Sequence, residues 1–264
     1  MGKTKAEPFS AYNCGMYMFA PLAEHYDDGF GAVADAFRDA AKKLREGSGE
    51  KPFQWGHLPE TYLLRHAIEL YLKSGIIIVH RKLRMPYGSE PYTSRKPLLL
   101  TSSGKWEELY NTHDLVRLFW YWKKLIDENK EKIAALLSAP ITDGAEGMEV
   151  PAELSRWIGR LGSLDPSGDY LRYPMSKNVG ADAKKSSFKE VAFEELVPEK
   201  RKDNEYIDNE YIKVMLVENS KGEVVKSFKY DSATGQDVAE AAREAVEILN
   251  NYHAMMRFGL TDGW

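Results

Sequence analysis

Residues 59–81 constrain the fold of this chain most strongly, because they have the spacing of a long helix and few polar side chains. Apolar residues occupy nearly every angle around the helix axis: Leu63, Leu64, Ala67, Ile68, Leu70, Tyr71, Leu72, Ile76, Ile77, Ile78 and Val79. A helix that is apolar nearly all round must be covered by other elements. We therefore expect this helix to lie at the centre of a helical bundle.

One polar stripe interrupts the apolar surface of this helix. It contains Tyr62, Arg65, His66, Glu69 and Lys73. Steps of three, four and seven residues return to nearly the same helical angle, so Tyr62, His66, Glu69 and Lys73 share a face with His80, and Arg65 lies beside that face. If the face is exposed, its two oppositely charged pairs, at i and i+4, contribute only about 0.2–0.5 kcal/mol each. If the face is shielded, the charges need partners or mark a cleft. The stripe is therefore either a solvated face or a functional centre.

Apolar periodicity predicts four further helices, at residues 21–46, 113–139, 152–161 and 234–258. Alternating apolar residues in 212–217 and 224–228 predict a β-hairpin that turns at Ser220, Lys221 and Gly222. Residues 181–209 are highly charged and show no clear period, so we treat 181–230 as a charged insertion that contains the hairpin. The expected fold is mainly α: a single domain over 1–264, with about five long helices and one small hairpin near the C-terminus.

Composition limits the class of protein. No stretch approaches the length of apolar residues that spans a bilayer, and the first residues lack an apolar signal region. The single cysteine, Cys14, excludes an intramolecular disulfide framework. We therefore expect a cytoplasmic protein without membrane contact. A formal net charge of −4 argues against coating of nucleic acid through bulk charge.

A local basic segment nevertheless lies between residues 81 and 105. It has six basic residues and one acid, Glu90, and it includes Tyr87 and Tyr92. Cationic and aromatic side chains in one segment can hold a phosphate backbone, which makes Arg81, Lys82 and Arg84 candidate ligand-binding residues. The alternative is an ordinary solvated loop.

Two other segments offer partners for the polar stripe. His113 and Asp114 fall at the start of a predicted helix, with Thr112 as its expected N-cap, and the free N–H groups there favour an anion such as phosphate. Arg172 lies two residues after Tyr170 and directly before Tyr173. Its guanidinium can bind a phosphate or clamp its own loop to the carboxylate of Glu69.

Three short segments together resemble a known family. They are Arg-His-Ala-Ile-Glu-Leu-Tyr-Leu-Lys at 65–73, Thr-His-Asp-Leu at 112–115, and Arg-Tyr-Pro at 172–174. This set, within residues 55–175, resembles uncharacterised bacterial proteins of the HEPN-like type. The resemblance implies a helical bundle, a homodimer, and a role in toxin–antitoxin or phage-defence systems with an antitoxin or another defence partner. It also implies RNA as a ligand, since many members are metal-independent ribonucleases.

The sequence departs from this family in one motif. Catalytic members carry an arginine followed a few residues later by a histidine, and here only His66 has an arginine close before it, the directly adjacent Arg65. No catalytic residue is therefore carried over from the family. The candidate catalytic set rests on its own chemistry and consists of His66, Glu69, His113 and Arg172, with Arg65, Lys73 and Asp114 as candidate ligand-binding residues.

Three functions compete on this basis. In the first, the histidines act as base and acid in RNA cleavage, with Glu69 orienting His66 and a cation at Arg172 or Lys73. In the second, a dimeric module binds a nucleotide, RNA or a protein partner without chemistry. In the third, His66, Glu69 and His113 hold a metal, although no second pair with matching spacing completes such a site. We favour the first two, with no metal and no cofactor.

Overall fold

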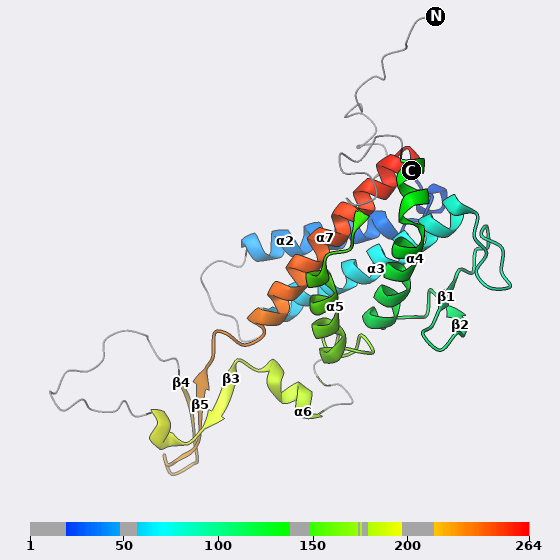
Figure 1. Ribbon diagram of the computed structural model, residues 1–264. Helices are drawn as coiled ribbons and strands as arrows, with labels where there is room; N and C mark the ends of the chain where they lie inside the picture. The colour runs from blue at the N-terminus through cyan, green and yellow to red at the C-terminus, as the bar shows by residue number, and fades with distance from the viewer. Residues whose placement is uncertain are drawn as a thin grey trace, which may run out of the picture.

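The computed structural model describes residues 20–47, 57–137, 148–173, 175, 179–196 and 214–263. Cys14 and Pro174 lie outside these ranges. Five long helices make up most of the structure (Figure 1): α2 (Phe30–Gly47), α3 (His57–Leu83), α4 (Leu115–Leu136), α5 (Ala152–Leu164) and α7 (Gln236–Thr261). Shorter helical pieces are η1 (Leu22–Glu24), α6 (Val179–Asp182), η3 (Ala183–Lys185) and η4 (Phe193–Leu196).

Helix α3 is the central element, as its composition predicts. It packs against α2, α4 and α7, and α5 closes the bundle by contacting both α4 and α7. Every residue of α3 from Ala67 to His80 is buried, and Ile68, Leu72, Ile76 and Ile77 have no exposed surface. Burial of this apolar surface drives the packing, at roughly 25 cal/mol per Å². The polar stripe therefore sits inside the protein rather than on its surface.

The expected fold class, a mainly α bundle with one hairpin, is wrong. The described residues form a mixed α/β structure that is 59% helical, and they contain two small antiparallel sheets with five strands in total. Strand β1 (Leu98–Leu100) lies in the segment that we expected to be a basic loop, and it pairs with β2 (Trp106–Glu108), which directly follows that segment. Three-residue strands are too short to show an alternating pattern, which is why the sequence did not reveal them.

The second sheet contains the predicted hairpin and one further strand. β4 (Val214–Glu218) and β5 (Val224–Tyr230) form the hairpin, and β3 (Phe188–Val191) pairs with the other edge of β5. β3 lies in the charged segment that could not be assigned, because a strand held by pairing with a distant segment needs no local pattern. In Figure 1 this sheet lies to one side of the helices, joined to α7 at one end.

Helix starts differ from the predictions where side chains cap the backbone. Helix α2 begins at Phe30, not near Pro21, because the carboxylate of Asp27 accepts the N–H groups of Gly29 and Gly31 at 3.0 and 2.7 Å. Helix α4 begins at Leu115, and Asp114 is its N-cap in place of Thr112. Such capping satisfies N–H groups that the first helical turn leaves free.

Candidate functional site

Glu69 is the centre of a buried ionic network on α3. Each of its two carboxylate oxygens accepts a hydrogen bond from a different cation. Oε2 lies 3.0 Å from Arg65 Nη1, and Oε1 lies 2.9 Å from Lys73 Nζ. The side chains of all three residues are at most 3% exposed. The pairs predicted from the helical spacing are therefore present, but as buried ion pairs. Removing one partner of a buried pair costs about 3–5 kcal/mol, far more than at a surface.

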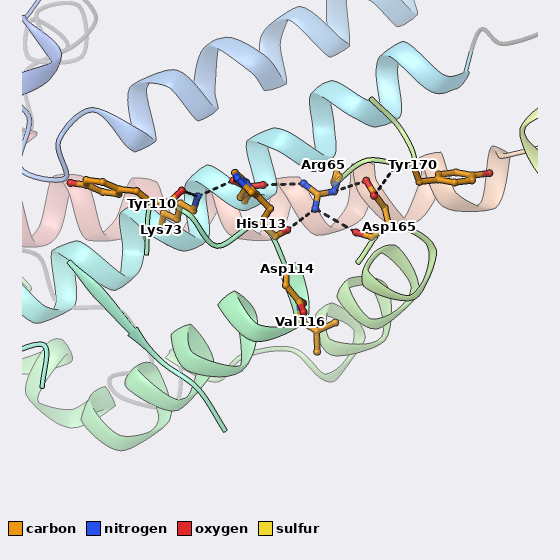
Figure 2. A network of polar contacts seen from close by, with 9 residues as sticks. Arg65, Lys73, Tyr110, His113, Asp114, Val116, Asp165 and Tyr170 are labelled. Carbon is orange, nitrogen blue, oxygen red and sulfur yellow. Dashed lines mark hydrogen bonds and ion pairs between the residues drawn. The ribbon is translucent and has the colours of Figure 1, made fainter. Parts of the chain in front are cut away.

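Both cations also hold segments that are distant in sequence (Figure 2). Lys73 Nζ donates to the carbonyl of Tyr110 at 3.1 Å, and Arg65 Nη2 donates to the carbonyl of His113 at 2.6 Å. Arg65 Nε lies 2.9 Å from Oδ2 of Asp165. Because two cations meet two carboxylates, the formal charge is balanced. The network fastens the loop before α4 and the turn after α5 to the central helix.

Asp165 is the member of this network that the sequence did not reveal. Its side chain is 1% exposed, and Oδ1 accepts the N–H of Tyr170 at 2.9 Å, which shapes the turn. Gly168 closes the same turn over Arg65 with a φ of +78°, and an added Cβ would lie 3.2 Å from Arg65 Nη2. An aspartate before proline in a turn-rich segment is typical of a turn. Its second role, as the counter-ion of Arg65, depends on tertiary structure and leaves no local pattern in the sequence.

The network keeps Glu69 ionised. Burial raises the pKa of this carboxyl, but the opposing effects of Lys73, Arg65 and the hydrogen bond to His113 lower it from 4.5 to about 2. At neutral pH Glu69 is therefore a permanent anion inside the protein, and it can only accept hydrogen bonds.

His113 joins this anion to the surface. Its Nδ1 lies 2.9 Å from Glu69 Oε1, and its side chain is 44% exposed whereas that of Glu69 is 1% exposed. An ionised carboxylate has no proton to give, so Nδ1 of His113 must donate, and Nε2 is the ring nitrogen that does not face Glu69. The same arrangement orients the imidazole in many acid–base sites. Glu69 thus forms its hydrogen bond with His113, whereas we expected it to orient His66.

No protein-family model matches this sequence. The search of curated proteins and the search of solved structures also gave no match.

His66 lies on the neighbouring position of the stripe but points to a different environment. Its ring packs edge-on against Phe37 with centroids 4.5 Å apart and is parallel to the ring of Tyr62 at 6.2 Å. Nδ1 is buried and has no hydrogen-bond partner among the described residues. Burial lowers the pKa of His66, and Arg65, Lys73 and Arg172 lower it further, while Glu69 raises it. His66 is therefore mainly neutral at pH 7.

Arg172 is exposed and lies on the His66 side of the stripe. Although burial lowers the pKa of Arg172, hydrogen bonds to Tyr173 and Tyr62 raise it above its ordinary value. Its effect on the pKa of His66 places the two side chains within electrostatic reach. The structure therefore brings Glu69 and His113 into direct contact, whereas His66 and Arg172 both contact Tyr62.

Apart from Arg84, the other predicted binding residues have structural partners. Asp114 caps α4 by accepting from the N–H groups of Val116 and Arg117. Arg81 forms a double contact with Asp28, at 3.1 and 2.8 Å, and Lys82 lies 4.8 Å from the ring centroid of Tyr26. Arg65 and Lys73, as described above, are committed to the network. Arg84 is exposed at the end of α3 with a φ of +54°.

Two further buried histidines serve packing. His80 Nδ1 donates to the carbonyl of Met85 at 2.9 Å, and its Nε2 lies 2.7 Å from the hydroxyl of Tyr121. His253 Nδ1 lies 3.1 Å from Ser74 Oγ, and both residues are at most 3% exposed. Within the described ranges, no group of three or more His, Cys, Asp or Glu side chains is arranged to hold a metal. Nor is any described helix long and apolar enough to cross a membrane.

Proposed function

We propose that this protein is a HEPN-like, RNA-directed protein that cleaves RNA by metal-independent acid–base chemistry at His113 and His66. The contact between His113 and the buried, ionised Glu69 carries this proposal. In this contact the imidazole of His113 is held in place and partly exposed, and the permanent negative charge of Glu69 lies directly behind it. A purely structural histidine does not need that exposure, as His80 and His253 illustrate.

The two imidazoles suit opposite halves of the reaction. His66, mainly neutral because its pKa is lowered, accepts the proton of the ribose 2′-OH. The 2′ oxygen then bonds to phosphorus, and the bond from phosphorus to the 5′ oxygen breaks. His113 gives its Nε2 proton to that leaving oxygen, while the hydrogen bond from Nδ1 to Glu69 holds the ring in place. The products are a 2′,3′-cyclic phosphate and a 5′-hydroxyl.

Arg172 supplies the cation that this reaction requires. Arg65 and Lys73 are held by buried carboxylates and carbonyls, so they are not available to a phosphate. Arg172 is exposed beside His66, and its guanidinium matches the geometry of a phosphate with developing charge.

Cleavage of a labelled single-stranded RNA in EDTA tests the proposal. We expect the wild type to release 2′,3′-cyclic phosphate ends, and His113→Asn to lower the rate at least about 100-fold, in the range of general acid–base catalysis. Asparagine keeps an N–H donor near the position of Nδ1, so the contact to Glu69 and the folded structure should remain. The control Arg117→Gln changes an exposed cation on α4, with a side chain that is 55% exposed, and should retain full activity.

Intact RNA after incubation with concentrated wild-type protein would refute the catalytic proposal. The second candidate, a binding module without chemistry, is favoured by one observation: the network pairs all of its own charges and so stands as a stable scaffold. Its signature would be RNA binding that weakens linearly on a log–log plot against salt, without turnover. Arg172→Gln would then weaken binding, whereas His113→Asn would not.

A further inference from the structure

Strand β4 presents an exposed apolar edge. It is the outer strand of the three-stranded sheet, whose order is β3, β5, β4, so one side of its backbone has no neighbour among the described strands. Val214, Met215, Leu216 and Val217 are consecutive and between 38 and 44% exposed. Successive strand residues point to opposite faces, so both faces of β4 are apolar as well as its free edge.

The sequence of β4 lacks the usual protection of an edge strand. Edge strands commonly carry lysine, proline or inward-pointing charges that prevent pairing with another chain. Residues Val214–Val217 contain none of these, whereas the opposite edge of the sheet, β3, carries Lys189 and Glu190. Only one of the two edges is therefore suited to accept another strand.

The described helices do little to cover this sheet. The main contacts of β3, β4 and β5 are with one another and with η4, and Figure 1 shows the sheet projecting from the end of the bundle. A small sheet without a packed layer is only marginally stable in water. Another strand at the free edge would satisfy the open backbone groups and remove apolar surface from water.

The charges near the two ends of β4 favour a second copy of this chain as the strand that pairs with its free edge. Two identical strands that pair antiparallel about a two-fold axis place the end of each beside the start of the other. β4 ends at Glu218, and its first residue, Val214, is in register with Lys229 of β5. Neither Glu218 nor Lys229 forms an ion pair with another described residue. The antiparallel arrangement brings Glu218 of each copy toward Lys229 of the other, so the two-fold axis creates two pairs of opposite charge.

We infer that β4 is a homodimer interface, in which two copies pair antiparallel to form one six-stranded sheet. This inference is independent of the proposed function, since the sheet contains none of the candidate catalytic residues. Loss of dimerisation and loss of RNA cleavage are therefore separate outcomes.

Single cysteines along β4 test the pairing directly. In full-length protein with Cys14→Ser, residues 214–217 are changed to cysteine one at a time and mildly oxidised. The residue nearest the two-fold axis lies opposite the same residue of the other copy. One position should therefore cross-link far more than its immediate neighbours, whose side chains point to the other face of the sheet. Equal cross-linking at all four positions, or none at any, would overturn the inference.

Sedimentation of the same protein gives a second readout. We expect a dimer for Cys14→Ser, and Leu216→Lys should weaken association by at least about tenfold, because it places like charges near each other across the interface. Val225→Lys is the matched control: Val225 is 55% exposed but lies on β5, so association should persist. Equal thermal unfolding of the variants shows that the fold is kept. A wild-type monomer, or a dimer that Leu216→Lys leaves unchanged, would contradict the inference, including the case in which β4 binds a different protein.

Discussion

At the scale of single residues, burial changes what the pairs around Glu69 contribute. Helical spacing predicted two salt bridges on α3, and both are present. Spacing could not predict that Asp165 and two backbone carbonyls complete the network, because they come from segments about 40 to 100 residues away in sequence. Glu69 thereby changes from a weak surface partner to the residue on which two cations and one histidine depend.

Acid should destabilise the protein partly through Glu69. Its pKa is lowered in the folded state, so its contribution to stability is present above pH 4.5 and is lost as the pH falls toward 2. A shift from 4.5 to about 2 corresponds to roughly 3 kcal/mol. Urea unfolding between pH 6 and pH 3 measures it. Glu69→Gln should show a shallower fall in the free energy of unfolding than the wild type.

The same variant should already be less stable at pH 7, by about 3–5 kcal/mol, because Arg65 and Lys73 lose their shared counter-ion. Glu149→Gln, whose side chain is 72% exposed, is the control and should keep the wild-type pH dependence. If the free energy of unfolding fell with pH equally steeply for Glu69→Gln and the wild type, Glu69 would not be ionised in the network as described.

At the scale of elements, helices were predictable and short strands were not. The apolar period located all five long helices, because each buries one face or more against the core. Their ends were less predictable, since Asp27 and Asp114 fix the starts of α2 and α4 through side-chain contacts. Strands β1, β2 and β3 depend on pairing between segments, which no local pattern records.

Close approach between α2 and the histidine of α7 gives an element-scale prediction. A Cβ added at Gly31 would lie 2.0 Å from Cε1 of His253, which is 3% exposed and cannot move away freely. Gly31→Ala should therefore lower the free energy of unfolding by about 1–3 kcal/mol, despite the better helix propensity of alanine. Denaturant unfolding followed by circular dichroism measures this change.

Gly159 in α5 provides the matched comparison. A Cβ there meets nothing within 4 Å, so Gly159→Ala should stabilise the protein by about 0.5–1 kcal/mol through helix propensity alone. If both alanines stabilised the protein equally, the packing of α2 against His253 would be wrong.

At the scale of the whole molecule, the central helix organises both the fold and the candidate site. Its apolar body fixes α3 at the centre of the bundle, and its polar stripe gathers the loop before α4 and the turn after α5. The sequence therefore identified the helix and most of the side chains in the buried ionic network. It could not separate scaffold from surface: Arg65, Glu69 and Lys73 are buried, and only His113 and Arg172 of the candidate catalytic residues are exposed.

The pH dependence of RNA cleavage in EDTA tests the acid–base account most directly. Burial and nearby cations lower the pKa of His66, so the proposed base stays neutral below pH 6.5, and the rate should fall only as the pH drops further. His66→Asn should remove the acid limb together with most of the activity. Absence of cleavage at every pH, or a rate that His66→Asn and His113→Asn leave unchanged, would contradict the account.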